Sequence, residues 1–389
     1  MADSDVLFTI TSAHLDTGLR GFPVGTCLTS DVDPQLGVTY VGYPIADLYD
    51  LPPEAVVFLL FKKHLPDDRE LAEFKAELQR RMGMPQAALT ALGALPESGH
   101  PMEWLITGLM LLGMTGKTGN YAEDALNVVA WAPELVAAIF RLRNGWGELI
   151  PPDRSKGLVE NFVHMMGMPG GDTELLTQIL SNFYVLHMDH GGGNLSTFTG
   201  RAIASGHADV FASLAGAMAA LYGPLHGRAN QDCLNFVRSV GSSDPDEVER
   251  FVRDSIAKGN VIYGFGHAVL RAEDPRATIQ YKLGQELIPN DPLFKTALTL
   301  RTVANRVLTE LGKVKNPNPN VDAVSGTLLN AVGLTDSNFY TVLFGFSRIT
   351  GIAAQIVDER TVQRNGRGVA IYRPDYLPVD QPPRRLKAD

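Results

Sequence analysis

The sequence predicts a large, nearly all-α protein in which a second domain is inserted into the first. Three observations support this prediction. Helical patterning covers most of the chain from residue 45 to residue 357, and no linker, repeat or low-complexity tract splits it. The 389 residues are enough for about two domains. The β-like runs are short and lie next to glycine or proline, at residues 7–11, 38–43 and 369–372.

The first half of the chain is interpreted as a series of helices. Pro52-Pro53-Glu54 opens a helix that runs to His64, because proline suits the first helical position. Residues 67–81 have the charge density of an exposed helix. Two apolar stretches predict further helices at residues 101–112 and 122–142.

Two histidines are expected at the end of one helix. Asp172 is its candidate N-cap, and its apolar face is formed by Leu175, Leu176, Ile179, Leu180 and Phe183. We expect this helix to deliver His187 and His190 at its C-terminal end, where three glycines, residues 191–193, stop it. The next helix, residues 208–222, is rich in small side chains that let another helix approach closely.

A strong helix start follows at residues 243–247. Asp244 can cap this helix, Pro245 suits its first position, and Glu247 can complete a capping box. Gly259 closes the helix, and helical patterning resumes over residues 277–312.

Asn316-Pro317-Asn318-Pro319-Asn320 is expected to be a stiff, extended segment. Each proline fixes its own backbone and restricts the residue before it. The segment leads to Asp322 and to helices at residues 325–332 and 341–357.

Composition places the chain among soluble globular proteins, with 45% apolar and 20% charged residues. A net charge of −9 without long charged runs argues against nucleic acid or an anionic membrane as the main partner. The two cysteines, Cys27 and Cys233, supply neither a disulfide framework nor a cysteine-based metal-binding motif. The acidic N-terminus lacks signal-peptide features, and the longest apolar passage, residues 55–61, is too short to cross a bilayer. We therefore expect a cytoplasmic protein.

Three stretches place glycine beside histidine between residues 187 and 276: His187–Asn194, Gly223–Gly227 and Tyr263–Arg271. Glycine allows a ligand to approach the backbone closely, and histidine titrates nearest neutral pH. Together the stretches predict a polar pocket walled by loops.

Taken alone, His187 and His190 at spacing i, i+3 leave two other interpretations open. They form a metal pair, which with Asp189 would make a hydrolase, or they are ordinary histidines of a buried loop. Activity that survives a strong chelator would exclude the hydrolase.

Five motifs resemble the citrate synthase family, in the family's order and at similar separations. They are His187-x-x-His190 with Gly192-Gly193-Asn194, Gly223-Pro224-Leu225-His226-Gly227, Gly264-x-Gly266-His267 with Asp274-Pro275-Arg276, Asn320-Val321-Asp322-Ala323 with Ser325-Gly326, and Phe346-Ser347-Arg348. Weaker likeness extends the resemblance over residues 20 to 375, approximately. The resemblance implies a multi-helical citrate-synthase-like fold with two helical domains. The large domain (1–227 and 334–389) is used in dimerisation. The smaller inserted domain (228–333) carries the catalytic base and contacts CoA.

The resemblance implies an acyltransferase of the tricarboxylic acid cycle. The family joins the methyl carbon of acetyl-CoA to the ketone of oxaloacetate and then hydrolyses the citryl thioester, without a metal or other cofactor. Asp322 matches the base that removes the methyl proton. His226 matches the N–H donor that stabilises the enolate oxygen, and His267 matches the group that polarises the ketone.

The remaining matches concern substrate binding. His190 resembles the histidine that orients oxaloacetate, and Arg276, Arg348 and Arg373 match three arginines that bind its carboxylates, which suit a planar guanidinium. Arg373 would reach the site of a neighbouring subunit in a homodimer. The residues that would hold the histidines are Ser196, Asp274 and Asn194, and the residues that would contact CoA are Lys313, Lys315, Val261, Gly264 and Gly266.

The sequence departs from the commonest family pattern beside the site. Gly191 stands where many relatives carry Glu, Arg228 follows the His226-Gly227 pair, and Val324 replaces a frequent histidine. These changes leave open which acyl group is used, since one methylene is worth only about 1–3 kcal/mol in a pocket. A 2-methylcitrate synthase, or an enzyme for longer acyl-CoA, is therefore an alternative. The intact matched residues argue against a catalytically silent member.

Overall fold

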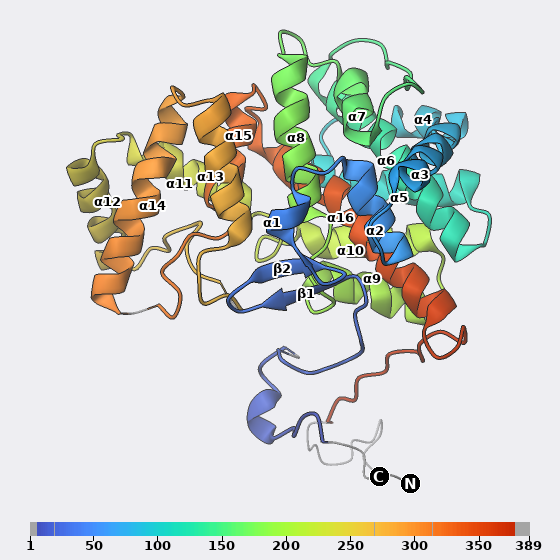
Figure 1. Ribbon diagram of the computed structural model, residues 1–389, viewed down its shortest axis with the longest axis horizontal. Coiled ribbons are helices and arrows are strands. Elements are labelled where there is room, and N and C mark those ends of the chain that lie inside the picture. Colours follow the sequence, from blue (N-terminus) through green and yellow to red (C-terminus); the bar gives the residue numbers. More distant parts are fainter. Residues whose placement is uncertain (1–5, 19, 268, 313, 378–389) are drawn as a thin grey trace, which may run out of the picture.

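The computed structural model describes residues 6–18, 20–267, 269–312 and 314–377. These residues are mainly helical, with one small sheet, which confirms the predicted fold class (Figure 1). The helices are α1 (Ile45–Leu48), α2 (Pro53–Lys62), α3 (Asp68–Arg81), α4 (Gln86–Leu92), α5 (Pro101–Gly116), α6 (Tyr121–Asn144), α7 (Leu158–Met166), α8 (Thr173–His187), α9 (Leu195–Ser205), α10 (Val210–Tyr222), α11 (Ala229–Val240), α12 (Pro245–Ala257), α13 (Pro275–Leu287), α14 (Pro292–Leu311), α15 (Asp322–Ala331) and α16 (Tyr340–Val357). Three short helical turns complete them: η1 (Ser12–His14), η2 (Ser337–Phe339) and η3 (Asp358–Val362).

The sheet is antiparallel, in the order β1 (Ser30–Asp33), β2 (Gly37–Tyr40), β3 (Tyr43–Pro44). The predicted run 38–43 corresponds to β2 and the turn into β3, whereas β1 was not predicted because its serine and aspartates have low strand propensity. Ser30 pairs with Tyr40, and Asp33 with Gly37, so pairing overrides the propensity. The expected runs at 7–11 and 369–372 are wrong, since both are irregular in the structure.

Several predicted helix ends are confirmed in detail. The Asp172 carboxylate accepts hydrogen bonds from the backbone N–H groups of Glu174 and Leu175, each at 3.1 Å, and so begins α8. Asp244 caps α12 in the same way, but the capping box is wrong. The backbone N–H of Asp244 donates instead to Ser242 Oγ at 3.1 Å.

The helix that carries Asp322 begins three residues earlier than predicted. Asp322 is the first residue of α15 and therefore lies in its first turn. Its neighbour Val321 already has helical dihedral angles, so the extended segment turns into the helix immediately before the carboxylate.

Two long apolar helical stretches form the centre of the fold. α16 packs against α6, α8 and α10, and its side chains are almost all buried. Stretches 121–144 and 337–362 are long and apolar enough to cross a membrane, but 83% and 89% of their apolar windows are buried inside the fold. Core helices of a globular protein have the same properties. Both stretches are longer than the apolar passage 55–61 that stood out in the sequence, which lies within α2.

The helices from α11 to α15 gather at one end of the molecule (Figure 1). They pack mainly on one another, α11 against α15 and α12 against α14. Their main contacts with the rest of the fold are those of α13 and α15 with α8, of α13 with α1, and of α11 with α16 and η2. This grouping agrees with a separate unit, and the predicted division at residues 228–333 stays a prediction.

Small residues let α10 lie close to its neighbours, as its composition predicts. A Cβ added to Gly200 of α9 would lie 3.1 Å from the Ala217 Cβ of α10. One added to Gly113 of α5 would lie 2.8 Å from the Cβ of Phe211, an atom fixed to the backbone of α10. Neither site has room for a larger side chain.

We predict that Gly113→Ala lowers the free energy of unfolding by about 1–3 kcal/mol, because overpacking separates α5 from α10. Alanine is the better helix former by about 1 kcal/mol, so a purely local effect would have the opposite sign. Gly93→Ala at the end of α4 is the control, since its added methyl meets only ordinary contacts at 3.6 and 3.7 Å. Urea unfolding of both variants measures the difference, and equal stabilities would contradict the close packing.

Candidate active site

Side chains from six segments influence one another in a single region. They come from the loop after α8, the turn 223–227, the loop 264–272, the first turns of α13 and α15, and α16. Burial is the largest influence on the pKa of His190 and of Asp322, and Arg276 and Arg348 both act on each of them as well. Arg348 also lowers the pKa of His226, and Arg276 that of His267. Such coupling requires proximity, so these three histidines, two arginines and Asp322 lie in one region of the fold.

His226 lies in the turn between α10 and α11, where its backbone N–H donates to Gly223 O at 2.9 Å. Its Nε2 faces Ser196, the second residue of α9, whose backbone N–H lies at 3.2 Å and whose Oγ lies at 2.9 Å. A backbone N–H can only donate, so Nε2 is the acceptor and the ring proton is on Nδ1. Burial and Arg348 lower the pKa of His226 to about 4, which keeps the ring neutral.

His267 is in the opposite tautomer to His226. Its Nδ1 accepts two backbone hydrogen bonds, from Val269 N–H at 3.0 Å and Leu270 N–H at 2.9 Å. The proton therefore lies on Nε2. An acceptor at Nδ1 makes this imidazole a neutral donor, and burial, then the charge of Arg276, lowers the pKa of His267 in the same sense. Its ring centroid is 5.7 Å from that of His190.

His187 and His190 have different surroundings. His187 is fully buried, donates from Nδ1 to Phe183 O at 2.8 Å and stacks on the Phe183 ring, as a core histidine would. His190 lies on the loop beside His267, and burial lowers its pKa well below the ordinary value. In the described part of the chain, no three His, Cys, Asp or Glu side chains are grouped to hold a metal ion. The metal-pair interpretation therefore lacks a third ligand within these residues.

The two buried arginines differ in their partners. Arg276 makes a two-point ion pair with Asp274, Nε to Oδ1 at 3.0 Å and Nη2 to Oδ2 at 2.7 Å. Arg348 donates from Nε to His187 O at 3.0 Å and lies over the Phe344 ring, but no described carboxylate lies within ion-pair distance. Burial lowers the pKa of Arg348 to about 10. A buried cation without an anion is unfavourable, so Arg348 is suited to an anionic ligand.

Asp322 is a buried carboxylate of the site whose pKa lies near neutrality. Its backbone N–H donates to Asn320 Oδ1 at 3.0 Å, while its carboxylate accepts no hydrogen bond from the described residues. Burial raises its pKa to about 6, against the opposing charge of Arg276. A carboxylate in this environment can act as a base near neutral pH.

The supporting residues are partly those expected. Asn194 caps α9, and its Oδ1 accepts from Ser196 Oγ at 2.9 Å, so both stand behind His226. Asp189 was considered only as a metal ligand, yet it is the centre of a buried network. Its carboxylate accepts hydrogen bonds from Thr29, from Ser30 Oγ at 2.8 Å and from Gln355 Nε2 at 2.7 Å. A fully buried aspartate needs such donors, but only the fold shows which segments supply them.

The residues expected to contact CoA are less closely grouped in the structure than the histidines and arginines described above. Val261 and Lys315 are exposed, and Lys313 lies outside the described residues. Gly264 and Gly266 have φ angles of +82° and +89°, which favour glycine, and a Cβ on Gly264 would lie 2.7 Å from the Cα of Ala323. Arg373 is exposed on the C-terminal segment and makes none of the contacts that join the other site residues.

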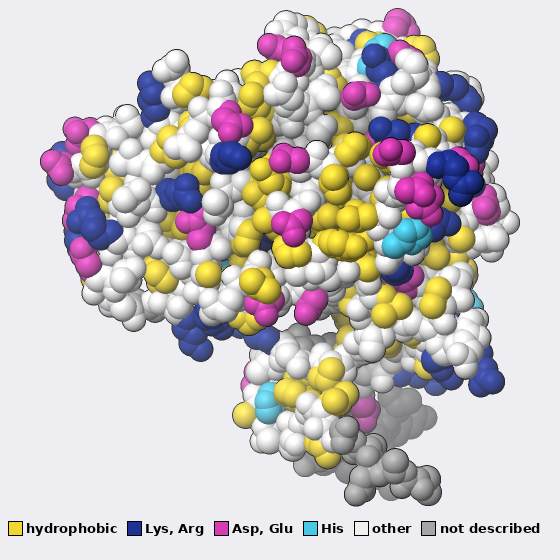
Figure 2. Space-filling view, viewed as in Figure 1, with side chains coloured by type: hydrophobic (Ala, Val, Ile, Leu, Met, Phe, Trp, Pro, Cys, Tyr) yellow, Lys and Arg dark blue, Asp and Glu magenta, His cyan; other side chains and the backbone are white. Residues whose placement is uncertain are grey.

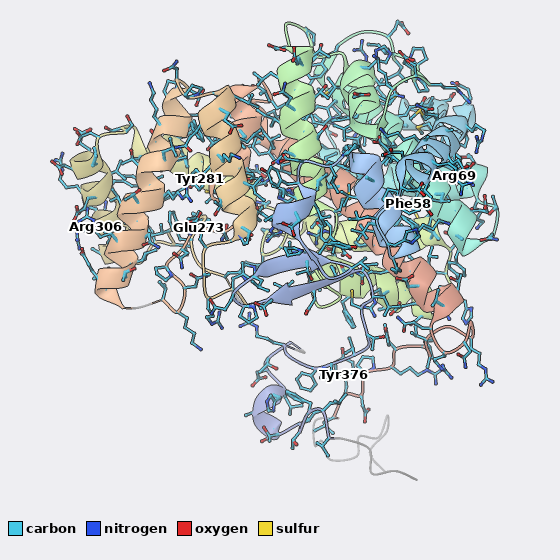
Figure 3. The ribbon with its side chains drawn as sticks, in the orientation of Figure 1. Phe58, Arg69, Glu273, Tyr281, Arg306 and Tyr376 are labelled. Atoms are coloured by element: carbon cyan, nitrogen blue, oxygen red, sulfur yellow. The ribbon has the colours of Figure 1, made fainter. Side chains whose placement is uncertain are left out.

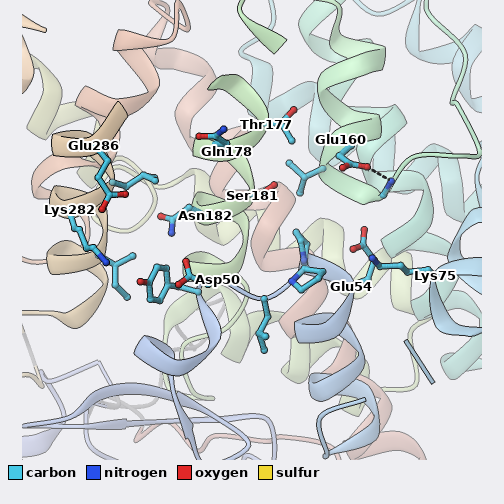
Figure 4. Close-up of a pocket in the computed structure, with 18 of the residues that line it drawn as sticks. Asp50, Glu54, Lys75, Glu160, Thr177, Gln178, Ser181, Asn182, Lys282 and Glu286 are labelled. Carbon is cyan, nitrogen blue, oxygen red and sulfur yellow. Dashed lines mark hydrogen bonds between the residues drawn. The ribbon is translucent and has the colours of Figure 1, made fainter. Parts of the chain in front are cut away.

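A cavity of about 680 Å³ lies elsewhere, between α7, α8, α13 and the start of α2. Figure 4 shows Gln178, Ser181 and Asn182 of α8 facing Lys282 and Glu286 of α13 across it. None of the matched histidines, arginines or aspartates lines this cavity.

Comparison with known proteins gives a consistent result. A family model described as the citrate synthase C-terminal domain matches residues 18–375. The chain is 36% identical to the mitochondrial citrate synthase 4 of Arabidopsis thaliana, covering 93% of this chain and 81% of that protein. It is 35% identical to the peroxisomal citrate synthase of Saccharomyces cerevisiae, covering 92% and 82%.

Solved structures share the fold. The crystal structure of citrate synthase from Thermotoga maritima MSB8 superposes with a TM-score of 0.80 at 29% identity, covering 94% of this chain and 95% of that one. The ternary complex of carboxymethyl coenzyme A and oxaloacetate with citrate synthase from Thermoplasma acidophilum gives a TM-score of 0.84 at 23% identity, covering 96% and 98%. The second likeness concerns the fold alone.

The expected cytoplasmic location is contradicted by the relatives. Those from Arabidopsis thaliana and Daucus carota are mitochondrial, and the yeast one is peroxisomal. The prediction depended on two cysteines and an acidic N-terminus, which do not distinguish one reducing compartment from another.

We predict opposite stability changes for the two buried arginines. Arg348→Gln should raise the free energy of unfolding by about 1–3 kcal/mol, because the folded state disfavours a charge that has no carboxylate partner. Arg276→Gln should lower it by about 3–5 kcal/mol, because it leaves buried Asp274 unpaired. Guanidinium unfolding at pH 8 compares the two variants with the parent protein. A loss of similar size in both would show that Arg348 is as well compensated as Arg276.

Proposed function

Because the chain belongs to the citrate synthase family, a family of acyltransferases that convert the acyl group into an alkyl group on transfer, we propose that it condenses acetyl-CoA with oxaloacetate and water to give citrate and CoA. One observation carries the proposal. Arg348 acts on the imidazole of His226, Arg276 acts on that of His267, and both arginines act on the carboxylate of Asp322, whose pKa burial raises. This is the set of groups needed to deprotonate a weak carbon acid beside an activated keto acid.

Asp322 is the proposed base. Its carboxylate removes a proton from the methyl group of acetyl-CoA, and the electron pair of the C–H bond moves into the enolate. Burial raises its pKa to about 6, which makes the carboxylate a stronger base than an exposed aspartate while it remains ionised above that pH. The rigid segment that precedes α15 limits its movement, which favours contact with the methyl group.

His226 is proposed to stabilise the negative charge that appears on the thioester oxygen. Its Nε2 is held by Ser196, so the Nδ1–H is the donor directed away from α9. A neutral, positioned N–H donor can stabilise an enolate without first giving up a proton. The lowered pKa of His226, about 4, keeps this donor neutral throughout the working pH range.

The acceptor is proposed to lie between His267 and the arginines. The new carbon–carbon bond forms at the ketone carbon of oxaloacetate, and His267 Nε2–H stabilises the oxygen that becomes the hydroxyl. His190, beside His267, would orient the ketone. Arg348 and Arg276 would bind the carboxylates, and Arg348 gains the anion that it lacks in the protein alone. Water then hydrolyses the citryl thioester and releases CoA. No step of this scheme uses a metal or another cofactor.

The CoA portion is proposed to lie along the loop 261–266 and Lys315, with Lys313 as a further contact outside the described residues. The turns at Gly264 and Gly266 leave the backbone without side chains there, so a ligand can approach it.

A homodimer is also proposed, with Arg373 completing the site of the partner subunit. Both terminal segments project from the helical body on the same side, and Tyr376 lies on the outer part of one of them (Figures 1 and 3). Hydrophobic side chains gather on this projection in Figure 2. Leu7 and Tyr376 are 80% and 84% exposed, which is unfavourable unless another surface covers them. A second copy of the chain would do so.

The proposed reaction is tested by thiol release from acetyl-CoA with and without oxaloacetate, and in parallel from propionyl-CoA. We expect release that depends on oxaloacetate, with a kcat/KM for acetyl-CoA at least about 10-fold higher, the order of discrimination available from one methylene. Citrate is identified in the products. A preference for propionyl-CoA would favour 2-methylcitrate synthase, the alternative function, and no release with either would refute both.

We predict that the condensation rate falls as the pH drops through about 6, because Asp322 must be ionised and burial raises its pKa to that value. His226 adds no second step there, since burial lowers its pKa to about 4. Asp322→Asn should reduce kcat by roughly 10²–10⁴. Oxaloacetate binding, measured by calorimetry, should persist.

The same variant should be more stable than the parent protein at pH 8. The folded-state pKa of Asp322 lies above its value in the unfolded chain, so its ionisation opposes folding once the pH rises above both. Removing the charge should add about 1–3 kcal/mol to the free energy of unfolding. Near-normal turnover by Asp322→Asn, or a loss of stability at pH 8, would count against the assignment of the base.

A further inference from the structure

We propose that Asn316 is a positioning residue that fixes the imidazole of His267 and couples it to the segment carrying Asp322. The kinetic part of this inference rests on the proposed function, whereas the structural part does not. Asn316 lies six residues before Asp322, at the start of the extended Asn-Pro-Asn-Pro-Asn segment.

The side chain of Asn316 is 3% exposed and uses all of its hydrogen-bonding capacity. Its Nδ2 group donates to Leu270 O at 3.0 Å and to Ala272 O at 3.1 Å. Its Oδ1 accepts from the backbone N–H of Asn318 at 3.0 Å and from Asn318 Nδ2 at 2.8 Å. Asn316 therefore joins two loops that are more than 40 residues apart in sequence.

The first of these loops sets the tautomer of His267. Leu270 is held at both of its backbone groups, since its N–H donates to His267 Nδ1 at 2.9 Å and its carbonyl accepts from Asn316. The two N–H groups that keep the proton of His267 on Nε2 belong to the turn that Asn316 closes. Without the amide, Ala272 O loses the donor that Asn316 supplies, and Leu270 O keeps only Arg271 Nη1, at 2.9 Å, so the turn loses its link to the second loop.

The second loop carries Asp322. Gly266, the residue before His267, donates to Asn318 O at 3.0 Å and accepts from Asn320 Nδ2 at 2.9 Å. Asn320 Oδ1 in turn accepts from Asp322 N–H at 3.0 Å. The two loops are thus bonded along their length, with Asn316 at one end and Asn320 at the other. Any loosening at Asn316 changes the distance between the ketone donor and the base.

A matched control lies on the outer side of the same segment. Asn305 of α14 donates from Nδ2 to Asn318 Oδ1 at 2.8 Å and to Pro317 O at 3.3 Å, and it makes no contact with the His267 turn. Asn305→Ala therefore removes the same kind of side chain, bonded to the same segment, without touching the support of the imidazole. Asn316→Asp is a second variant of equal shape, which keeps the acceptor for Asn318 and loses both donors.

The experiment measures two independent properties of the full-length protein. Nitrogen-15 NMR of labelled histidines reports the tautomer of His267, which is assigned with His267→Gln. We expect one tautomer in the parent protein and in Asn305→Ala, and a mixture in Asn316→Ala and Asn316→Asp. Steady-state kinetics should show kcat reduced about 10- to 100-fold in both Asn316 variants, as for a catalytic group displaced by about 1 Å. Asn305→Ala should stay within about 2-fold, the range of a change that leaves the reacting groups in place.

A double-mutant cycle separates positioning from simple loss of stability. If Asn316 acts through His267, Asn316→Ala should cost little further activity in the His267→Gln background. Unchanged histidine spectra, or kinetic losses equal to those of Asn305→Ala, would overturn the inference. Altered spectra in a protein that forms no citrate would instead refute the proposed function and leave the positioning role of Asn316 intact.

Discussion

The removal of charged groups from water is the constraint on which this structure depends. α16 passes through the centre of the fold with nearly every side chain buried, and it carries Arg348 into that environment. A guanidinium placed there without a carboxylate is unfavourable, and the same low polarity raises the pKa of Asp322 and keeps His226 and His267 uncharged. The core thus determines the chemical state of each group in the site before any substrate arrives.

Within that environment, backbone N–H groups decide where each imidazole proton lies. Ser196 occupies Nε2 of His226, whereas Val269 and Leu270 occupy Nδ1 of His267. The two rings therefore present donors from opposite nitrogens. No side-chain carboxylate hydrogen-bonds to either ring among the described residues, and burial outweighs the charge of Asp274, which alone would raise the pKa of His267.

The sequence was sufficient to predict most helices and the family, while the roles of the central site residues stay predictions. Asp172 and Asp244 marked helix starts because a cap is a local interaction between residues two or three apart. β1 was not predictable in this way, since its polar residues form a strand only through pairing with β2. The Asp189 network was also inaccessible, because its donors come from residues about 160 positions away in either direction. The compartment was predicted wrongly, because no residue pattern within the fold encodes it.

The tight turn at Gly264 has a consequence for how the site can change. This residue packs directly on the backbone of Ala323, the neighbour of Asp322, with no space for even one methyl group. Any side chain placed at position 264 would therefore push against the first turn of α15, so this glycine helps to keep the carboxylate of Asp322 where the fold places it.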